Sequence, residues 1–194
     1  MKRTIKENIE EKLKQELTID EYEKFTSLLE PITIQKKQQL VFEDKVCKYL
    51  YFVEQGVLHS YLTDDNGENH TIQFGFEGHW ISDLFSFVSN TPATFNIEAL
   101  EETEILAISK TNFEKALQDI PKFERFFRIL IQNAYIQSQH RIAKNYSDDA
   151  EHRYLALIKQ QPDLLQRVPQ YLVASYLGIK PQSLSRIRQN LSKK

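Results

Sequence analysis

The side chains best suited to chemistry gather near the carboxyl end of the chain. Gln, Ser and Arg side chains recur there at helical spacing, and each can bond a base edge or a phosphate oxygen in a major groove. The candidates for base edges are Gln182, Ser183 and Arg186. The candidates for phosphate contacts, which set the pose of a protein on a duplex, are Gln170, Lys180, Ser185 and Arg188. The pattern predicts a surface that reads double-stranded DNA.

The charge of this segment supports that prediction. Residues 164 to 194 hold six Lys or Arg and no Asp or Glu, whereas the remaining residues carry 19 basic side chains against 27 acidic ones. The near-neutral total therefore hides a basic tail, which is the electrostatic signature of a nucleic-acid partner.

Two short helices joined by a turn, between residues 169 and 191, must position these side chains. Ala174 is small enough for the point where two steeply crossed helices touch, and Gly178 can supply the positive φ of the turn. Pro181 suits the first position of a second helix. The apolar slots between the helices are filled by Val173, Leu177, Ile179, Leu184 and Ile187. The spacing predicts a helix-turn-helix, and the alternative is an ordinary helical hairpin with a solvated basic face.

The bulk composition narrows the class of protein. The chain has 194 residues, of which 41% are hydrophobic and 27% charged, as in soluble globular proteins. We expect a cytoplasmic protein without membrane contact, because no apolar run reaches membrane-spanning length and the amino terminus lacks a signal-peptide block. The single Cys47 excludes an internal disulfide and any iron–sulfur or zinc site built from several cysteines of one chain.

The residue composition before the basic tail divides that region into a helical segment and a strand-rich segment. Residues 1 to 30 read as helices, with a predicted capping box at Thr18 and Glu21. From Pro31 to about Ser109 short β-branched and aromatic runs predict roughly eight strands, with a hairpin turn ending at Gly67 and a helical insert over residues 80 to 93. This pattern is typical of a β-roll or jelly roll with room for a small ligand.

A helix is predicted to begin at Thr111, where Glu114 completes a capping box, and to run to about Asp119. A second helix, about 37 Å long, is predicted to follow from Pro121 to about Tyr146. Such a length favours a dimer seam against a second copy, although packing against the roll in the same chain is the alternative. We predict a domain boundary near Tyr146, with Asp148 capping the next helix. The predicted fold class is α+β: a sensor domain over 1–146, with flanking helices and a dimerisation helix, and a helix-turn-helix domain over 147–194.

This order of elements resembles the Crp/Fnr family of bacterial transcription regulators, especially its short members from Bacteroidetes-type bacteria. The resemblance is carried by GVLHSYLTDDNGENHTIQF, IEALEETEILAIS, IPKFERFFRILIQNAYI and RVPQYLVASYLGIKPQSLSRIRQNL. It implies a homodimer, a small-molecule sensor in the roll and two reading helices on a palindromic operator; RNA polymerase is a further candidate partner. The family's base-reading slots match Pro181, Gln182, Ser183 and Arg186, so the operator should differ from the family's best-known one.

The ligand site departs from the family pattern. Where cyclic-nucleotide-binding members have a Gly-Glu pair for the ribose and an Arg-Ser/Thr pair for the phosphate, this sequence has Ser82-Asp83 and Ala93-Thr94. Burying a phosphate without a cation is costly, so tight binding of cAMP or cGMP is not expected. The candidate effector pocket consists of Trp80, Ser82, Asp83, Leu84, Ala93 and Thr94.

Other function classes have less support. A cupin-like metalloenzyme would need a His-x-His ligand pair, but His59, His70 and His79 stand far apart in the sequence, so neither a metal site nor an enzyme is predicted. The leading function is a DNA-binding transcription regulator whose degenerate pocket senses an unknown ligand or none, with no cofactor. The alternative is a β-roll sensor or protein-interaction module that does not bind DNA.

Overall fold

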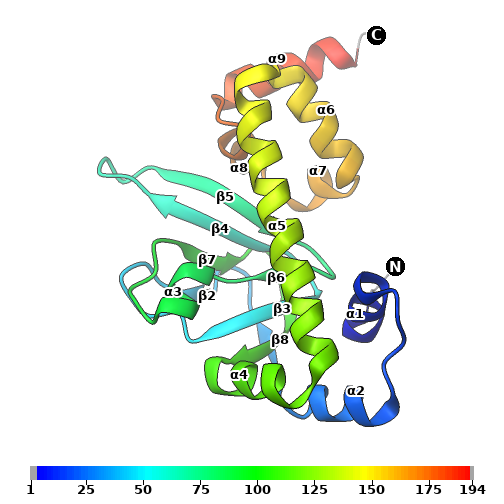
Figure 1. The fold of residues 1–194 in the computed structure, drawn as a ribbon. Helices are drawn as coiled ribbons and strands as arrows, with labels where there is room; N and C mark the ends of the chain where they lie inside the picture. Colours follow the sequence, from blue (N-terminus) through cyan, green and yellow to red (C-terminus); the bar gives the residue numbers. More distant parts are fainter. Residues whose placement is uncertain (1–3, 193–194) are drawn as a thin grey trace.

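Two four-stranded antiparallel sheets face each other across the middle of the chain in the computed structural model, which describes residues 4–192 (Figure 1). The first sheet contains, in spatial order, β1 (Glu30–Ile34), β8 (Thr103–Ser109), β3 (Tyr49–Gln55) and β6 (Trp80–Ile81). The second contains β2 (Gln39–Val41), β7 (Asn96–Ala99), β4 (Leu58–Thr63) and β5 (Asn69–Gly75). The runs rich in β-branched and aromatic residues therefore form strands, as predicted.

The turn between β4 and β5 shows how local chemistry fixes the register. Asp64 Oδ1 accepts hydrogen bonds from the N–H groups of Asn66 and Glu68, both at 2.9 Å, and Gly67 adopts a φ of 79°. Glycine reaches that conformation without the steric cost that a Cβ would bring. The turn thus holds the two longest strands of its sheet in a projecting hairpin.

The predicted helical insert is shorter than expected. Trp80 and Ile81 form strand β6, because they pair with Phe52 and Tyr51 in the first sheet. The helix α3 (Leu84–Ser89) begins only after Asp83, whose side chain caps it. The prediction of helix was therefore wrong for residues 80 to 83, because Trp80 and Ile81 pair across strands, and for residues 90 to 93, because Asn90 ends the helix with a φ of 59°.

Four helices cover the first sheet: α1 (Ile5–Leu13), α2 (Ile19–Thr26), α4 (Lys110–Asp119) and the first half of α5 (Pro121–Ser147). Their apolar stripes enter the main core, where the rings of Phe25 and Phe123 have centroids 4.4 Å apart and Phe126 is buried beside Trp80. The capping box at Thr18 and Glu21 is present as predicted.

Two predicted caps are displaced. Ser109, and not Thr111, caps α4, because strand β8 ends at Ser109 and its hydroxyl accepts from the N–H of Asn112. Asp149, and not Asp148, caps the helix that follows α5, since α5 continues to Ser147 and leaves Asp148 at its carboxyl end.

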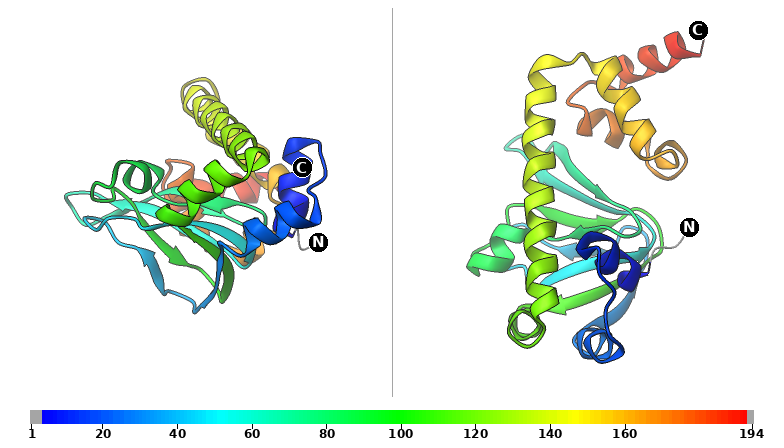
Figure 2. Two further views of the ribbon diagram at one scale, coloured as in Figure 1. Left: turned by 60° about the horizontal axis from the view of Figure 1, so that its bottom comes forward. Right: turned by 45° about the vertical axis from the view of Figure 1, so that its right-hand side comes forward.

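The second half of α5 rises beyond the sheets towards the carboxyl-terminal helices (Figures 1 and 2). Its large apolar side chains are exposed, with Tyr135 at 65%, Ile136 at 51%, Ile142 at 47% and Tyr146 at 91%. The first half buries Phe123 and Phe126 against the roll. The helix therefore packs on its own roll at one end and presents uncovered apolar surface at the other.

The carboxyl-terminal helices are α6 (Ala150–Gln160), α7 (Leu164–Arg167), α8 (Gln170–Tyr176) and α9 (Pro181–Leu191). Val173, Ala174 and Leu184 are fully buried where α8 meets α9, and Gly178 in the turn has a φ of 66°. Pro181 is the first residue of α9. Among the described residues, none of these helices or the preceding ones combines the length and apolarity needed to cross a bilayer.

Candidate functional site

The predicted DNA-facing side chains lie on and beside α9, at the end of the molecule away from the amino-terminal helices (Figure 1). Five of the seven are exposed, namely Gln170, Lys180, Gln182, Ser185 and Arg186. Ser183 and Arg188 are partly exposed on the same helix. The arrangement leaves Arg186 and Gln182 accessible to a groove, while the apolar side of α9 faces α8.

A partly buried arginine that the sequence analysis did not single out holds this unit together. Arg153, in α6, donates from Nη1 to the carbonyl of Asp148 at 2.9 Å and from Nη2 to the carbonyl of Leu177 at 3.1 Å. Leu177 follows α8, so the guanidinium bonds carbonyl groups at the carboxyl ends of both α5 and α8. A cation is favourable at such ends because the helix dipole is negative there.

The carboxyl-terminal helices also dock directly on the roll. The Ser175 hydroxyl in α8 accepts a hydrogen bond from the N–H of Thr71 in β5 at 2.9 Å, and Tyr176 packs on Phe74 with ring centroids 5.5 Å apart. Arg141 of α5 lies over the Tyr176 ring and donates to the carbonyl of Ile72. One apolar cluster contains residues of both parts: Val57, Phe74 and Phe76 from the roll, with Tyr154, Leu164, Val168, Leu172, Val173, Ala174, Leu177 and Leu184.

Arg167, one of the six cations of the basic tail, is engaged in ion pairs within the chain. Its Nη1 and Nη2 donate to the two carboxylate oxygens of Glu77 at 2.9 and 2.7 Å, and its Nε donates to Glu101 at 3.1 Å. Burial alone would raise the pKa of the Glu77 carboxyl, but the bonds from Arg167 and from the Gly56 N–H outweigh it and lower the pKa to about 2. The Arg167 pKa is raised, first through its bond to Glu77. This cation therefore contributes little to a DNA-facing charge.

Asp83, the acidic member of the candidate effector pocket, is buried and satisfied by backbone groups. Its Oδ1 accepts from the N–H of Ser86 at 3.0 Å, and its Oδ2 accepts from the N–H groups of Thr94 and Phe95 at 2.7 and 3.1 Å. The side chain is 1% exposed. The carboxylate thus joins the start of α3 to the segment before β7, and its oxygens point away from solvent.

The neighbouring pocket candidates are also engaged in the fold. Ser82 donates to the carbonyl of Tyr49 at 3.0 Å, and Ala93 is buried with its N–H bonded to Lys45. Trp80 packs between the rings of Phe52 and Phe126 in the main core. Leu84 is partly buried against that core, whereas Thr94 is exposed. The six residues occupy one region, but the structure fixes most of them by internal contacts.

A hollow of about 420 Å³ lies elsewhere on the surface, against α2 and α4. It is lined by Lys24, Ser27, Leu28, Lys115, Asp119 and Ile120. It shares no residue with the predicted effector pocket.

The three strand-region histidines lie apart. His59 Nε2 is 3.0 Å from the Thr71 hydroxyl, the His79 ring accepts from the Phe76 N–H, and His70 contacts Asp64 at the hairpin tip. Asp64, Glu68 and His70 lie near enough to share a cation. However, Asp64 Oδ1 already holds the turn, and acidic groups at exposed turns are common without a metal.

Comparison with known proteins finds one family model that matches the roll. Residues 31–119 match the model of the cyclic nucleotide-binding domain. The catabolite activator protein of Thermus thermophilus is 17% identical, with a TM-score of 0.60 over 94% of this chain and 87% of that one. FixK2 of Bradyrhizobium japonicum is 17% identical, with a TM-score of 0.74 over 85% of each chain.

A third solved structure, a putative regulator of the crp/fnr family from Eubacterium rectale, is 15% identical with a TM-score of 0.68 over 91% of this chain and 84% of that one. Among curated protein sequences, none matches the chain. At these identities the shared property is the fold.

Proposed function

We propose that this chain, which carries a cyclic nucleotide-binding domain and shares the fold of Crp/Fnr transcription regulators, is itself a sequence-specific DNA-binding regulator of that type. The observation that carries the proposal is the outward face of α9. It presents Gln182 and Arg186 to solvent at the tip of a docked helical unit. An arginine fork matches the acceptors of guanine, and a glutamine amide matches those of adenine.

The reading unit is the helix-turn-helix formed by α8 and α9. Ala174 is fully buried at the helix crossing and Gly178 supplies the left-handed turn, so α9 is held at a fixed angle on α8. Lys180 is exposed at the residue before α9, where a phosphate contact would set the pose on the duplex. Arg186 is the residue that we assign to guanine.

We assign the functional form as a homodimer joined through the second half of α5. A soluble monomer rarely leaves a helix with several large apolar side chains uncovered, and Tyr135, Ile136 and Ile142 are each about half exposed or more. Pairing that half of α5 with its copy removes this surface from water. It also places two copies of α9 on one duplex, about one helical turn apart.

The roll acts as a sensor of a ligand other than a cyclic nucleotide, or as a scaffold without one. The segment that would meet a phosphate has Ala93 where a cation is needed, and the nearby N–H groups of Thr94 and Phe95 are already bonded to Asp83. A second anion at this point would meet the Asp83 carboxylate. We therefore assign no cofactor and no enzymatic activity.

Selection of binding sites from random DNA with the purified full chain tests the proposal. We expect a palindromic consensus with half-site centres about 10 base pairs apart and a conserved guanine in each half. Arg186→Ala should relax selection at that guanine while the spacing stays. Failure to enrich any sequence, with the protein folded and dimeric, would show that the chain is a protein-interaction or sensor module instead.

A further inference from the structure

Arg167 stands at the junction between the carboxyl-terminal helices and the roll. It is the last residue of α7, and α8 begins at Gln170, so its backbone sits just before the reading unit. Its guanidinium reaches the turn between β5 and β6 at Glu77 and the turn between β7 and β8 at Glu101. One side chain of the carboxyl-terminal unit is thus bonded to two separate turns of the roll.

The Glu77 carboxylate is held in place by the roll itself. Its Oε1 accepts from the N–H of Gly56 at 2.9 Å, and Gly56 cannot be replaced cheaply, since a Cβ there would fall 2.3 Å from Thr103 Oγ1. A carboxylate fixed by a rigid backbone turn meets the planar guanidinium in a two-bond fork. Such charge-assisted, bidentate pairs are stronger and more directional than single ion pairs.

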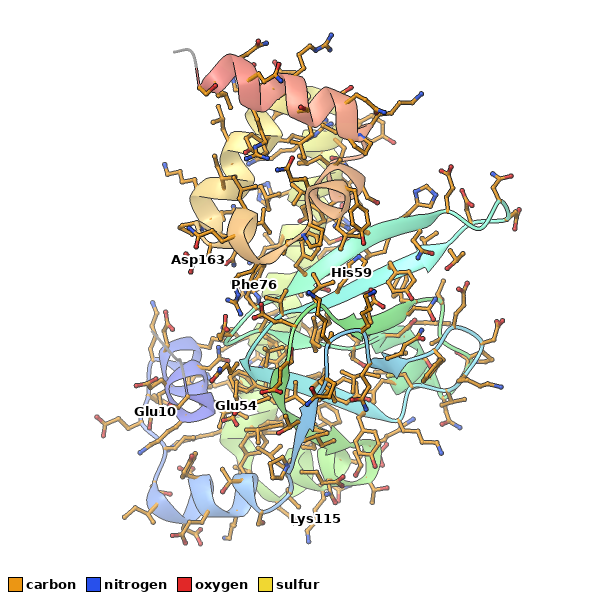
Figure 3. The ribbon with its side chains drawn as sticks, turned by 180° about the vertical axis from the view of Figure 1, so that it is seen from behind. Glu10, Glu54, His59, Phe76, Lys115 and Asp163 are labelled. Atoms are coloured by element: carbon orange, nitrogen blue, oxygen red, sulfur yellow. The ribbon has the colours of Figure 1, made fainter. Side chains whose placement is uncertain are left out.

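The surroundings keep this contact partly out of water. The side chains of Arg167 and Glu77 are each 23% exposed, and the guanidinium lies 5.7 Å from the ring centre of Phe76. Phe76 is buried with Leu164 and Val168, on either side of Arg167 in the sequence. Figure 3 places Phe76 where the roll meets the segment that contains Asp163. The bonds from Arg167 to Glu77 and Glu101 therefore form a partly buried connection between the carboxyl-terminal helices and the roll, which we call the joint.

The position of α9 depends on this joint because α9 packs on α8, which follows Arg167 in the chain. A second attachment, from Ser175 to Thr71, holds the carboxyl end of α8 on the roll, and Val173 and Ala174 pack α8 against Leu184 of α9. Because Arg167, three residues before α8, and Ser175 are both bonded to the roll, α8, and with it α9, is held in one position relative to the roll. The side chains that would face DNA stay exposed in this docked arrangement.

We propose that Glu77 and Glu101 are positioning residues of the DNA reader. They hold Arg167, and through it α8 and α9, in the orientation that presents two reading helices to one duplex; this inference rests on the proposed function. A reader fixed before binding loses less orientational freedom on the DNA than one that swings, so affinity is higher without any further DNA contact. Arg167 serves this joint and contacts no phosphate.

The variants Glu77→Gln and Glu101→Gln, singly and combined, test the proposal. Glu114→Gln, at an exposed position of α4, is the matched control for loss of one negative charge. These changes keep the Arg167 charge and leave α9 untouched. We expect the double variant to bind the selected operator about tenfold more weakly, with the same dependence on salt. Amide hydrogen exchange over residues 164–177 should be accelerated more than exchange in β3 and β8, where any increase follows the loss of global stability.

A second comparison separates positioning from a direct DNA contact. If Arg167 acts only through the joint, Arg167→Gln, Glu77→Gln and the combined variant should lose similar affinity, because each removes the same contact. If Arg167 binds a phosphate, Arg167→Gln alone would lower the salt slope by about one for each subunit, which overturns the proposal.

The remaining outcomes are also decisive. Faster exchange in α7 and α8 with unchanged operator affinity would show that the joint is structural only, and a rise in affinity would show that it restrains the reader. A wild-type protein that binds no DNA would refute the proposed function. In that case the exchange data still decide whether the two carboxylates position α8.

Discussion

Asp83 Oδ2 accepts a 2.7 Å hydrogen bond from the N–H of Thr94, which joins the amino end of α3 to the segment that leads into β7. The same oxygen accepts from Phe95. Backbone N–H groups that converge on one point are a common way of holding an anion. Here the anion is part of the chain, so the loop is closed without an external ligand.

This closure predicts how the roll responds to nucleotides. Calorimetric titration of the full chain with cAMP or cGMP should detect no binding in the micromolar range, because a bound phosphate would compete with Asp83 and find no cation at Ala93. Micromolar affinity for either nucleotide would contradict the assignment of a degenerate pocket.

The Asp83 carboxylate should also be important for stability. Asp83→Asn keeps one oxygen acceptor but turns an amide NH2 group towards at least one of the three converging N–H groups, and this mismatch should lower the free energy of unfolding by about 1–3 kcal/mol. Asp65→Asn, on an exposed turn, is the control that should change it by less than about 0.5 kcal/mol. Equal denaturant midpoints for the two variants would show that Asp83 is not a structural anion.

His59 predicts a pH dependence of folding. It is buried among Tyr61, Phe74 and Thr71 on the side of the roll that meets α8, and burial lowers the pKa of the imidazole to about 4 (Figure 3). Its Nδ1 lies 3.5 Å from the Glu98 carboxyl, but an imidazole with a pKa of about 4 is neutral at pH 7, so this contact is not an ion pair there.

Since the unfolded histidine titrates near 6.5, the folded protein binds this proton less tightly and stability is lost as the pH falls from about 6.5 towards 4. The loss attributable to His59 should reach up to about 3 kcal/mol. Chemical unfolding between pH 7 and 4 measures it: the advantage of wild type over His59→Gln should shrink across this range. A constant difference would mean that His59 does not titrate on unfolding.

Glu77 predicts a second acid-sensitive contribution at lower pH. Its folded pKa of about 2 lies below the ordinary 4.5, so its stabilisation is fully present above about pH 5 and disappears as the pH falls towards 2. Glu77→Gln should therefore be less stable than wild type at pH 7, by up to about 3 kcal/mol, and this difference should shrink to about 1 kcal/mol or less at pH 2.5. A difference that persists at the lowest pH would point to lost packing instead of a lost charge.

The exposed half of α5 predicts the assembly state. Ile136→Glu places a charge in the proposed seam and should shift the protein from dimer to monomer in sedimentation velocity at micromolar concentration. Val88→Glu on α3 is the control, since the exposure of Val88, at 58%, is close to the 51% of Ile136. A dimer that survives Ile136→Glu but not Val88→Glu would place the interface on the roll.

Local signals in the sequence were sufficient for most of the fold. The strands rich in β-branched and aromatic residues, the turn at Gly67 and the capping box at Thr18 each depend on neighbours within a few residues, and the structure has all three. The displaced caps at Ser109 and Asp149 show the limit of this reasoning. Adjacent polar residues compete for the same cap, and where the preceding element ends decides between them.

Contacts between distant segments could not be predicted in this way. Nothing around Arg167 in the sequence indicates that Glu77 lies opposite it, because the pairing depends on how α7 docks on the roll. The bonds from Ser175 to Thr71 and from Asp83 to Thr94 likewise join separate parts of the chain. Residue type suggested the reading face of α9 and the altered pocket, whereas the joint that orients that face emerged only in three dimensions.

The salt dependence of operator binding is the sharpest test of whether α9 reads DNA. It is measured by fluorescence anisotropy on the selected sequence with wild type, Arg186→Ala and the control Arg125→Ala on α5. A dimer that neutralises about six phosphates should lose roughly a thousandfold in affinity between 50 and 200 mM salt. Arg186→Ala should cost about 1–3 kcal/mol per base contact, and Arg125→Ala should match wild type. Binding that is indifferent to salt, or equal loss from both substitutions, would contradict the account of α9 as a DNA-reading helix.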